Sequence, residues 1–355
     1  MSRPLFTTIH SAALRHNLSV VRRHAPASKV LAVIKANAYG HGLLRAVAAL
    51  ADADGYALLE LEAAVRLREA GYRQRIVLLE GFFDPEELPL LVRHRLAAVI
   101  HCQEQVAALD GLAPGAKLDV LLKVNTGMNR LGLPPDRVAA ACDRLRRNPG
   151  VGAITLLTHF ANADDARGVA WQMERLRELP NGDALPRSFA NSAAILRYPE
   201  THADWVRPGI MLYGCSPFPE SIGGEAGLTP AMTLESQIIA VRDLQPGDTV
   251  GYGGMFRAER PRRIGIVACG YADGYPRHAP NGTPVNVAGR TTGTVGRVSM
   301  DLLCVDLADI PEARPGTRVV LWGEGMPVER VAQAAGTVGY QLLCALAPRV
   351  RIVEA

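Results

Sequence analysis

The sequence lacks the features of a membrane protein, a disulfide-stabilised secreted domain or a nucleic-acid-binding protein. No apolar run is long enough to span a membrane, and the opening residues MSRPLFTTIH contain no apolar segment of signal-peptide length. The six cysteines are scattered without a CxxC pair, which is typical of reduced, packed thiols. The net charge is only +4, and no basic run is interleaved with aromatic residues. We therefore expect a cytoplasmic protein that binds neither membranes nor nucleic acid.

Several common catalytic signatures are missing as well. The sequence contains no metal-ligand spacing, no GxSxG, no P-loop and no GxGxxG. The composition, with 48% apolar and 21% charged residues, is that of an ordinary globular protein. A chain of 355 residues is long for one core, so we expect one large domain and a smaller one.

From residue 29 to about residue 214, short apolar runs alternate with amphipathic, helix-like stretches. Eight near-continuous apolar strands, each followed by a helix, favour a parallel sheet that is buried on both faces. Eight strands can close a barrel of the triosephosphate isomerase type, and an open, doubly wound sheet is the alternative. The predicted strands are KVLAVIKAN, GYALL, RIVLLEG, LAAVIHC, KLDVLLKVNTG, VGAITLLTHF, PRSFANS and WVRPGIMLYG.

After about residue 228 the sequence changes to short β-like runs, which are separated by turn signals such as PGD, NG and PG. One short helix is predicted in PVERVAQAAG, residues 327–336. We therefore predict an α/β protein in which a (β/α)8 barrel over residues 11–228 is followed by a mostly-β domain over residues 229–355. The β-like LFTTIH within residues 1–10 is a candidate to pair with this second domain.

The apolar run of the first predicted strand ends in a lysine, Lys35, which is soon followed by the turn sequence GHG at residues 40–42. A lone lysine at a strand end more often extends its ammonium group to the surface. Alternatively, the amine lies deep in the barrel mouth, where desolvation and neighbouring cations favour its neutral, nucleophilic form. Such a lysine is suited to forming a Schiff base.

Polar residues also collect at the ends of other predicted strands. Taken singly, each has an ordinary explanation, such as a surface arginine, a core histidine or an ion-pair partner. In a barrel, however, the C-terminal ends of the strands carry the active site, so their convergence predicts one. These residues are Lys123, with Arg130 just beyond it, His159, Asn191 with Ser192, and Arg207.

The ends of the last two strands carry Asn191 with Ser192, and the segment 207–210, Arg-Pro-Gly-Ile. Loops at this position of a barrel frequently bind phosphate, although ordinary turn chemistry explains either stretch alone. A Schiff-base lysine on the first strand and a phosphate site on the last two are what pyridoxal phosphate requires. The guanidinium group of Arg130 would suit the carboxylate of an amino acid.

The β half contains further candidates that local sequence does not separate. Tyr252 lies between glycines in TVGYGG, and a tyrosine there is ordinary for a hairpin. The same holds for Tyr271 and Tyr275 in GYADGYP and for Tyr340 in VGYQLLC, while Met300 could be a core residue.

Nine stretches, in order along both domains, resemble alanine racemases of the fold-type III pyridoxal-phosphate class. They are AVIKANAYGHG, LKVNTGMNRLG, THFANAD, ANSAA, VRPGIMLYG, VGYGG, GYADGYPR, VGRVSMD and VGYQLLC. The resemblance covers essentially the whole chain and implies a barrel followed by a β domain. It also implies the interconversion of L-alanine and D-alanine by two bases.

The resemblance implies a cofactor site in the barrel. Lys35 would hold pyridoxal 5'-phosphate, with Arg207 facing its pyridine nitrogen and Asn191 and His159 close to it. The residues implied around the phosphate are Tyr39, Ser192, Gly209, Ile210 and Tyr340.

The resemblance further implies a head-to-tail homodimer with shared active sites. Lys35 would take the proton from D-alanine, and Tyr252 from the other subunit would take it from L-alanine, with His159 bridging Tyr252 and Arg207. Arg130 and the backbone of Met300 would bind substrate. The resemblance also implies an entry corridor formed by Asp164, Arg277 and Arg297. Lys123 matches a lysine that is carbamylated in some members.

Two alternatives use the same cofactor. A fold-type III decarboxylase should carry a carboxylate where Arg207 stands, and a non-enzymatic pyridoxal-phosphate carrier usually lacks the β domain. One departure from the racemase pattern is Asn125, where many members carry aspartate. The sequence does not separate a biosynthetic role in supplying D-alanine for the cell wall from a catabolic one, nor does it set the activity on serine or the dimer affinity.

Overall fold

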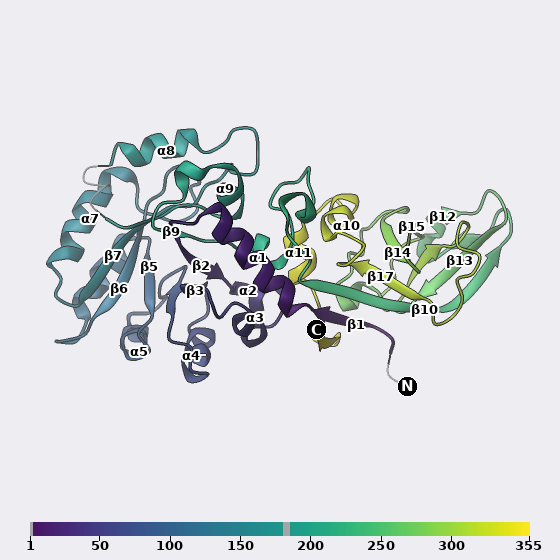
Figure 1. Ribbon diagram of the computed structural model, residues 1–355, viewed down its shortest axis with the longest axis horizontal. Coiled ribbons are helices and arrows are strands. Elements are labelled where there is room, and N and C mark those ends of the chain that lie inside the picture. Colours follow the sequence, from purple (N-terminus) through teal and green to yellow (C-terminus); the bar gives the residue numbers. More distant parts are fainter. Residues whose placement is uncertain (1–2, 180–184) are drawn as a thin grey trace. The chain divides into compact units, whose positions relative to one another are not determined.

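The computed structural model describes residues 3–179 and 185–355 (Figure 1). By internal contacts the chain divides into two compact units. The barrel unit comprises Leu18–Ala38 and Leu43–Leu212. The second unit comprises the chain up to Asn17, the short segment Tyr39–Gly42, and Tyr213–Ala355.

The barrel unit contains a closed barrel of eight parallel strands in sequence order, which confirms the predicted barrel and excludes the open sheet. It closes where β2 pairs with β9, with Lys29 opposite Trp205 and Val30 opposite Val206. Most strand residues are buried, since a parallel sheet covered by helices has no solvent face. The strands are β2 (Lys29–Val33), β3 (Gly55–Leu58), β4 (Arg75–Leu78), β5 (Ala97–Ile100), β6 (Leu118–Lys123), β7 (Val151–Leu157), β8 (Arg187–Ser188) and β9 (Trp205–Val206).

Helices follow the strands around the barrel (Figure 1). In α7 (Pro135–Arg147), proline occupies the first turn, three arginines occupy the last, and the buried residues recur at three- and four-residue spacing. Helix α1 (Ser11–His24) precedes β2. The helices that follow strands are α3 (Leu43–Ala49), α4 (Leu61–Glu69), η1 (Pro85–Glu87), α5 (Leu88–Arg93), α6 (Gln103–Ala108), η2 (Leu109–Gly111), α8 (Ala170–Arg177), α9 (Ser192–Arg197), η4 (Pro199–Thr201) and η5 (Ile210–Tyr213).

The chain leaves the first barrel strand in a left-handed turn, where the sequence had predicted continued strand. The strand β2 ends at Val33, and the four residues from Ala36 to Tyr39 all have φ between 51° and 55°. The left-handed conformation costs a non-glycine residue roughly 1–2 kcal/mol. Part of the turn is fixed by Asn37, whose Oδ1 accepts a hydrogen bond from the Leu43 N–H at 2.9 Å.

The second unit is built on an eight-stranded sheet in the order β13-β16-β15-β14-β17-β10-β1-β18. The long strand β10 pairs with β17 through its first half and with β13 through its second, so the sheet curls back on itself. The opening strand β1 is antiparallel to β10 and parallel to β18, and therefore belongs to this sheet. The strands are β1 (Phe6–Ile9), β10 (Met232–Leu244), β13 (Arg262–Val267), β14 (Pro284–Val287), β15 (Arg290–Val295), β16 (Leu303–Asp306), β17 (Arg318–Trp322) and β18 (Arg351–Glu354).

Shorter elements complete the second unit. A two-stranded sheet of β11 (Thr249–Val250) and β12 (Phe256–Arg257) flanks the turn η7 (Tyr252–Gly254). The predicted short helix is present as α10 (Val328–Ala334). A second helix, α11 (Gly339–Cys344), was not predicted, because six residues beginning with glycine carry too little helical periodicity. The second unit also contains the turns η6 (Gly223–Ala226) and η8 (Tyr271–Asp273).

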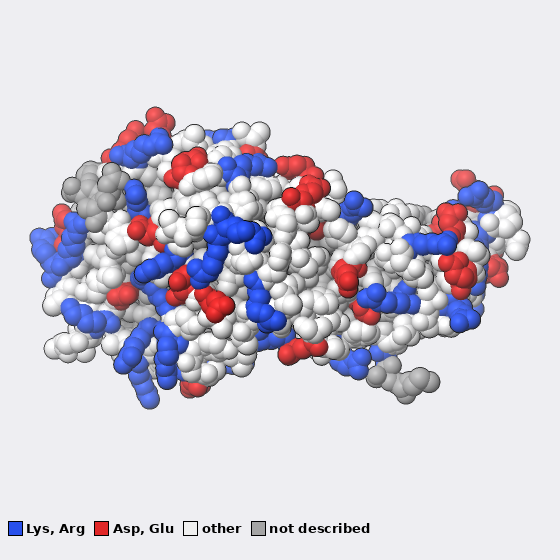
Figure 2. Space-filling model, viewed as in Figure 1, with Lys and Arg blue, Asp and Glu red and all other residues white. Residues whose placement is uncertain are grey.

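Charges of both signs are interspersed on the face drawn in Figure 2. This distribution agrees with the small net charge of +4. Within the part of the chain that the structure describes, no helix combines the length and the apolar character needed to cross a membrane.

Candidate active site

The barrel unit gathers the predicted polar residues at the C-terminal end of its strands. Lys35 comes two residues after β2, Lys123 is the last residue of β6, and His159 comes two residues after β7. Asn191 and Ser192 lie just beyond β8, and Arg207 directly follows β9. Because parallel strands of a closed barrel end on the same side, these residues share one mouth.

Lys123 is the most deeply placed amine of this set, with 8% of its surface exposed. Burial lowers its pKa to about 8, and the positive charges of Arg207, Arg130 and Lys35 act in the same direction. Only Glu80 opposes them. The mouth of the barrel is therefore a strongly cationic cavity, in which a bound anion would be stabilised.

Arg207 is held rigidly by main-chain carbonyls. Its Nη1 donates to the carbonyl oxygen of Ser188 at 2.6 Å and to the hydroxyl of the same residue at 2.9 Å. Its Nη2 donates to the carbonyl oxygens of Thr158 at 2.7 Å and Phe189 at 3.2 Å. Burial lowers the pKa of Arg207 to about 10, so the guanidinium is still charged at neutral pH. Among the described residues, no partner takes the Nε–H of Arg207.

His159 lies against this arginine, with its Nδ1 3.5 Å from Nη2 of Arg207. Burial lowers its pKa well below the usual value, and the charges of Arg207, Arg130, Lys123 and Lys35 lower it further. The imidazole is therefore neutral near pH 7. A neutral ring whose Nδ1 faces a guanidinium N–H carries its own proton on Nε2.

The loop that carries Arg130 follows β6 and is closed by an isolated bridge between Val124 and Leu133. Asn125 accepts hydrogen bonds from the N–H groups of Gly127 and Asn129 through its side-chain oxygen. Its amide nitrogen donates to Oδ1 of Asn129 at 2.9 Å. Asparagine therefore supplies the acceptor that an aspartate would, and adds a donor. Arg130 itself is exposed and, with Lys123 and His159, lines a small cavity.

The loops after β8 and β9 are joined by the Ser192 hydroxyl. Asn191 is the N-cap of α9, with Oδ1 accepting from the Ala194 N–H at 3.0 Å. Ser192 is buried, and its Oγ accepts from the N–H groups of Gly209 at 2.9 Å and Met211 at 3.4 Å. Ile210 follows within the same buried segment. A short cradle of hydroxyl and backbone N–H groups thus lies at the end of the last two strands.

Gln172 is a buried residue that the sequence reasoning missed. On α8 its Nε2 donates to Oγ1 of Thr126 at 2.6 Å and to the carbonyl oxygen of His159 at 3.1 Å, while its Oε1 accepts from the Ala161 N–H at 2.7 Å. It therefore ties the Arg130 loop to the His159 loop. The available signal was a glutamine within the apolar stripe formed by Val169 and Leu176.

In the second unit, Tyr39 forms the centre of an aromatic group. Its ring stacks on Tyr213 at 4.6 Å between centroids and lies 6.0 Å from Tyr340. Burial raises the pKa of Tyr39, so its phenol remains a hydrogen-bond donor at neutral pH. The structure brings Tyr39 and Tyr340 together as a pair, with Tyr213 as a third member that sequence reasoning did not single out.

The remaining candidates of the second unit differ in exposure. Tyr275 is fully buried and stacks against Trp322, which makes it a core residue. Tyr252 on η7 is 70% exposed and Met300 is 53% exposed. Arg277 is also exposed and Arg297 half-buried, while Asp164 is exposed in the barrel unit, on the loop after β7.

Comparisons with known proteins cover the whole chain. The family model for the alanine racemase N-terminal domain matches residues 9–217, and that for the C-terminal domain matches residues 231–354. The chain is 60% identical to an alanine racemase of Nitrosospira multiformis over 99% of this chain and 100% of that protein. It is 57% identical to one of Nitrosomonas europaea, with 100% and 99% covered.

Solved structures agree with these relatives. The crystal structure of biosynthetic alanine racemase from Pseudomonas aeruginosa matches with a TM-score of 0.96 and 47% identity, covering both chains completely. Alanine racemase from Acinetobacter baumannii matches with a TM-score of 0.95 and 38% identity, again over both complete chains. The chain therefore belongs to the alanine racemase family of amino-acid isomerases.

Proposed function

We propose that this enzyme interconverts L-alanine and D-alanine with pyridoxal 5'-phosphate, using Lys35 and Tyr252 as two bases on opposite faces of the substrate. The main support is the cationic barrel mouth. There the positive charges of Lys35, Arg130 and Arg207 lower the pKa of Lys123 and, together with Lys123, that of His159. Family membership supports the substrate, and the chemistry of the side chains supports the cofactor and the roles.

The residues of the barrel mouth fit this cofactor. Its aldehyde needs an amine, which Lys35 would supply, and its dianionic phosphate would offset the concentration of positive charge. The hydroxyl hydrogen of Ser192, whose oxygen accepts the Gly209 N–H, would take part in holding the phosphate, with the phenol of Tyr39 as a further donor. The Nε–H of Arg207, which has no partner among the described residues, would donate to the pyridine nitrogen.

When bound, pyridoxal phosphate supplies an electron-withdrawing system that acidifies the α-hydrogen of an attached amino acid. Arg207 would moderate this effect. A guanidinium that remains charged cannot accept a proton, and it disfavours a second positive charge on the nitrogen it faces. The ring would stay unprotonated, which limits side reactions such as transamination.

Inverting the α-carbon needs proton removal on one face and delivery on the other, so two bases are required. Lys35 would serve the D-isomer, and Tyr252 of the partner subunit would serve the L-isomer in a head-to-tail homodimer. A phenol loses its proton only well above neutral pH unless positive charge or hydrogen-bond donors are near. Neutral His159 would donate from Nε2 to the tyrosine oxygen, while its Nδ1 faces Arg207.

Substrate selection would depend on Arg130 and on the second unit. The guanidinium of Arg130 would bind the substrate carboxylate together with the backbone N–H of Met300. Tyr252, Tyr340 and the Met300 side chain would narrow the pocket to a methyl group. Asp164, Arg277 and Arg297 would line the approach of the charged substrate. Lys123, with a pKa of about 8, would be partly neutral at pH 7–8, which is the form that reacts with carbon dioxide to give a carbamate.

The direct test is to add L-alanine to the purified protein with pyridoxal phosphate and to follow optical activity to equilibrium. We expect decay to a racemic mixture, with the rate abolished in Lys35→Ala because both the cofactor attachment and one base are lost. A yellow, cofactor-loaded protein that leaves L-alanine unchanged would refute the proposal and point to a carrier or to another substrate.

A further inference from the structure

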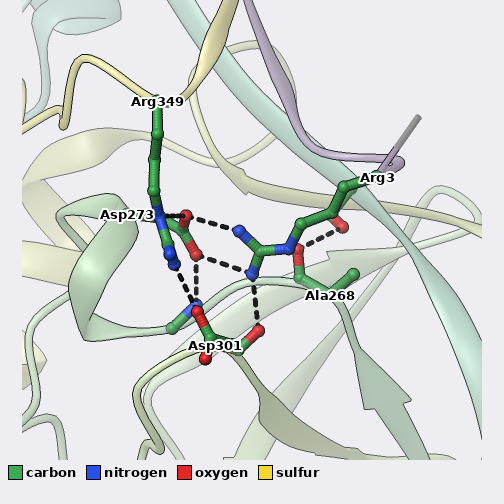
Figure 3. A network of polar contacts seen from close by, with 7 residues as sticks. Arg3, Ala268, Asp273, Asp301 and Arg349 are labelled. Atoms are coloured by element: carbon green, nitrogen blue, oxygen red, sulfur yellow. Dashed lines mark hydrogen bonds and ion pairs between the residues drawn. The ribbon is translucent and has the colours of Figure 1, made fainter.

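The second unit contains one carboxylate that is completely buried yet heavily hydrogen-bonded, that of Asp273 (Figure 3). Arg3 binds it with both Nη atoms, at 2.6 Å to Oδ1 and 2.8 Å to Oδ2. Arg349 donates from Nε to Oδ1 at 2.7 Å, and the N–H of Gly270 donates to Oδ2 at 2.9 Å. Residues from near both ends of the chain therefore meet on one side chain in the turn η8.

The same two arginines also bind Asp301, the residue that follows Met300 (Figure 3). Nη2 of Arg3 donates to the carbonyl oxygen of Asp301 at 2.6 Å. Nη2 of Arg349 donates to Oδ1 of Asp301, also at 2.6 Å. The network thus connects the turn η8 with the loop that contains Met300.

The turn and the loop are packed backbone against backbone. The N–H of Tyr271 donates to the carbonyl oxygen of Ser299 and that of Ala272 to the carbonyl oxygen of Met300, each at 3.0 Å. A Cβ atom on Gly270 would lie 2.4 Å from the carbonyl oxygens of Ser299 and Met300, so only glycine permits this approach.

These contacts fix the orientation of the Met300 peptide groups. The carbonyl oxygens of residues 299, 300 and 301 all accept hydrogen bonds from η8 or from Arg3. The N–H of Met300, in contrast, has no partner within residues 3–179 and 185–355, and the residue is 53% exposed. The carbonyl oxygens of this loop are held by hydrogen bonds, and the Met300 N–H is left as a donor in a fixed orientation. Such an N–H is preorganised to bind an anion.

We propose that Asp273, Arg3 and Arg349 are positioning residues, which hold the Met300 N–H in place for the carboxylate of the substrate. This inference rests on the proposed function, in which the Met300 backbone binds that carboxylate. None of the three side chains needs to touch the substrate. They act by fixing the carbonyl side of the 299–301 loop, so that the binding N–H is preorganised.

The charges of the network make it persistent at neutral pH. Burial by itself raises the pKa of Asp273, but the hydrogen bonds from Arg3, Arg349 and the Gly270 N–H outweigh burial and lower the pKa below its usual value. Asp273 is therefore ionised, and a buried carboxylate needs its partners. Arg3 and Arg349 are partly exposed, so their replacement is less disruptive to folding than that of Asp273.

The positioning role can be measured without cofactor or substrate. Hydrogen exchange, followed at the amides of Tyr271 and Ala272, reports whether η8 still donates to the loop. We expect faster exchange at these two amides in Arg3→Ala and in Arg349→Ala, with little change in the β10 strand. Arg351→Ala is the matched control, since Arg351 is an exposed arginine that lies over the ring of Phe6 and outside the network. Unchanged protection at both amides, or loss spread evenly over the unit, would overturn the proposal.

Kinetics then separate positioning from general stability. We expect the KM for alanine and the inhibition constant of propionate, a carboxylate without the amine, to rise about tenfold in Arg3→Ala, as expected for one hydrogen bond to a charged group. The kcat and the cofactor absorbance should change little, and Arg3→Lys should recover part of the loss. A lower kcat at unchanged KM would contradict positioning. Failure of the unaltered protein to racemise alanine would instead refute the proposed function, while the exchange result would still test the positioning itself.

Discussion

Among single residues, Arg207 has the most distinctive environment. Three carbonyl oxygens and one hydroxyl orient its guanidinium, and the side chain is almost fully buried. The guanidinium therefore has a fixed position and keeps its positive charge. These oxygen partners are neutral, so no carboxylate among them offsets that charge. An enzyme with this residue beside the pyridine nitrogen would use a deliberately weak electron sink and favour simple proton transfer.

This argument predicts the behaviour of Arg207→Glu. A carboxylate at this position would favour a protonated pyridine, strengthen electron withdrawal and raise the rate of transamination, measured as pyruvate formed from alanine. Glutamate would also face carbonyl oxygens, so Arg207→Gln, which removes the charge without adding a negative one, is the companion variant and should show a smaller rise. An unchanged rate of pyruvate formation in variants that still bind the cofactor would contradict this account of Arg207.

Among the elements, the left-handed turn after β2 is tightly constrained by its backbone. Gly40 has a φ of +80°, and a Cβ atom there would lie 2.2 Å from the carbonyl oxygen of Leu343 on α11. The turn therefore fits closely against α11, the helix that carries Tyr340 beside Tyr39. The geometry of this turn determines where the Tyr39 phenol lies within the second unit.

We predict that Gly40→Ala destabilises the protein by roughly 2–4 kcal/mol, because it adds positive-φ strain and a clash with a backbone oxygen. Gly316→Ala is the control in the same unit, since Gly316 has a φ of +91° and open space where a Cβ would lie. It should cost roughly 1–2 kcal/mol. Urea unfolding followed by circular dichroism measures the free energy of unfolding of both variants. Equal losses of stability in Gly40→Ala and Gly316→Ala would show that the contact with Leu343 adds no cost.

The elements also show what the sequence could and could not predict. The eight barrel strands were predictable because each is a short apolar run that a buried parallel sheet requires. The turn at Ala36–Tyr39 was not, because neither alanine nor asparagine in this run signals four consecutive left-handed residues. The Asp273 network was equally hidden, since nothing local indicates that Arg3 and Arg349 meet a residue so distant in sequence. The barrel residues of the candidate site could be predicted because each follows a recognisable apolar strand. Contacts between segments far apart in the sequence leave no local pattern and could not be predicted.

At the scale of the whole molecule, the proposed activity depends on a second copy of the chain. Tyr252 is 70% exposed and Met300 is 53% exposed, which suits residues that complete a site on a partner rather than pack in their own core. Dilution below the dissociation constant of the dimer should therefore remove activity together with the dimer.

Mixing two inactive variants tests this arrangement more sharply. Lys35→Ala and Tyr252→Phe each remove one base, so each homodimer should be inactive. If the two bases of one site come from different chains, a mixed dimer has one site with both bases and one with neither, and random reassociation should restore about a quarter of the normal activity. The control mixes Lys35→Ala with a variant that carries both substitutions. Both kinds of chain in this mixture lack Lys35, so no site can contain both bases and the mixture should stay inactive. Were both bases to act within one chain, reassociating the two single variants would restore nothing, and Tyr252 would have to serve the barrel of its own subunit.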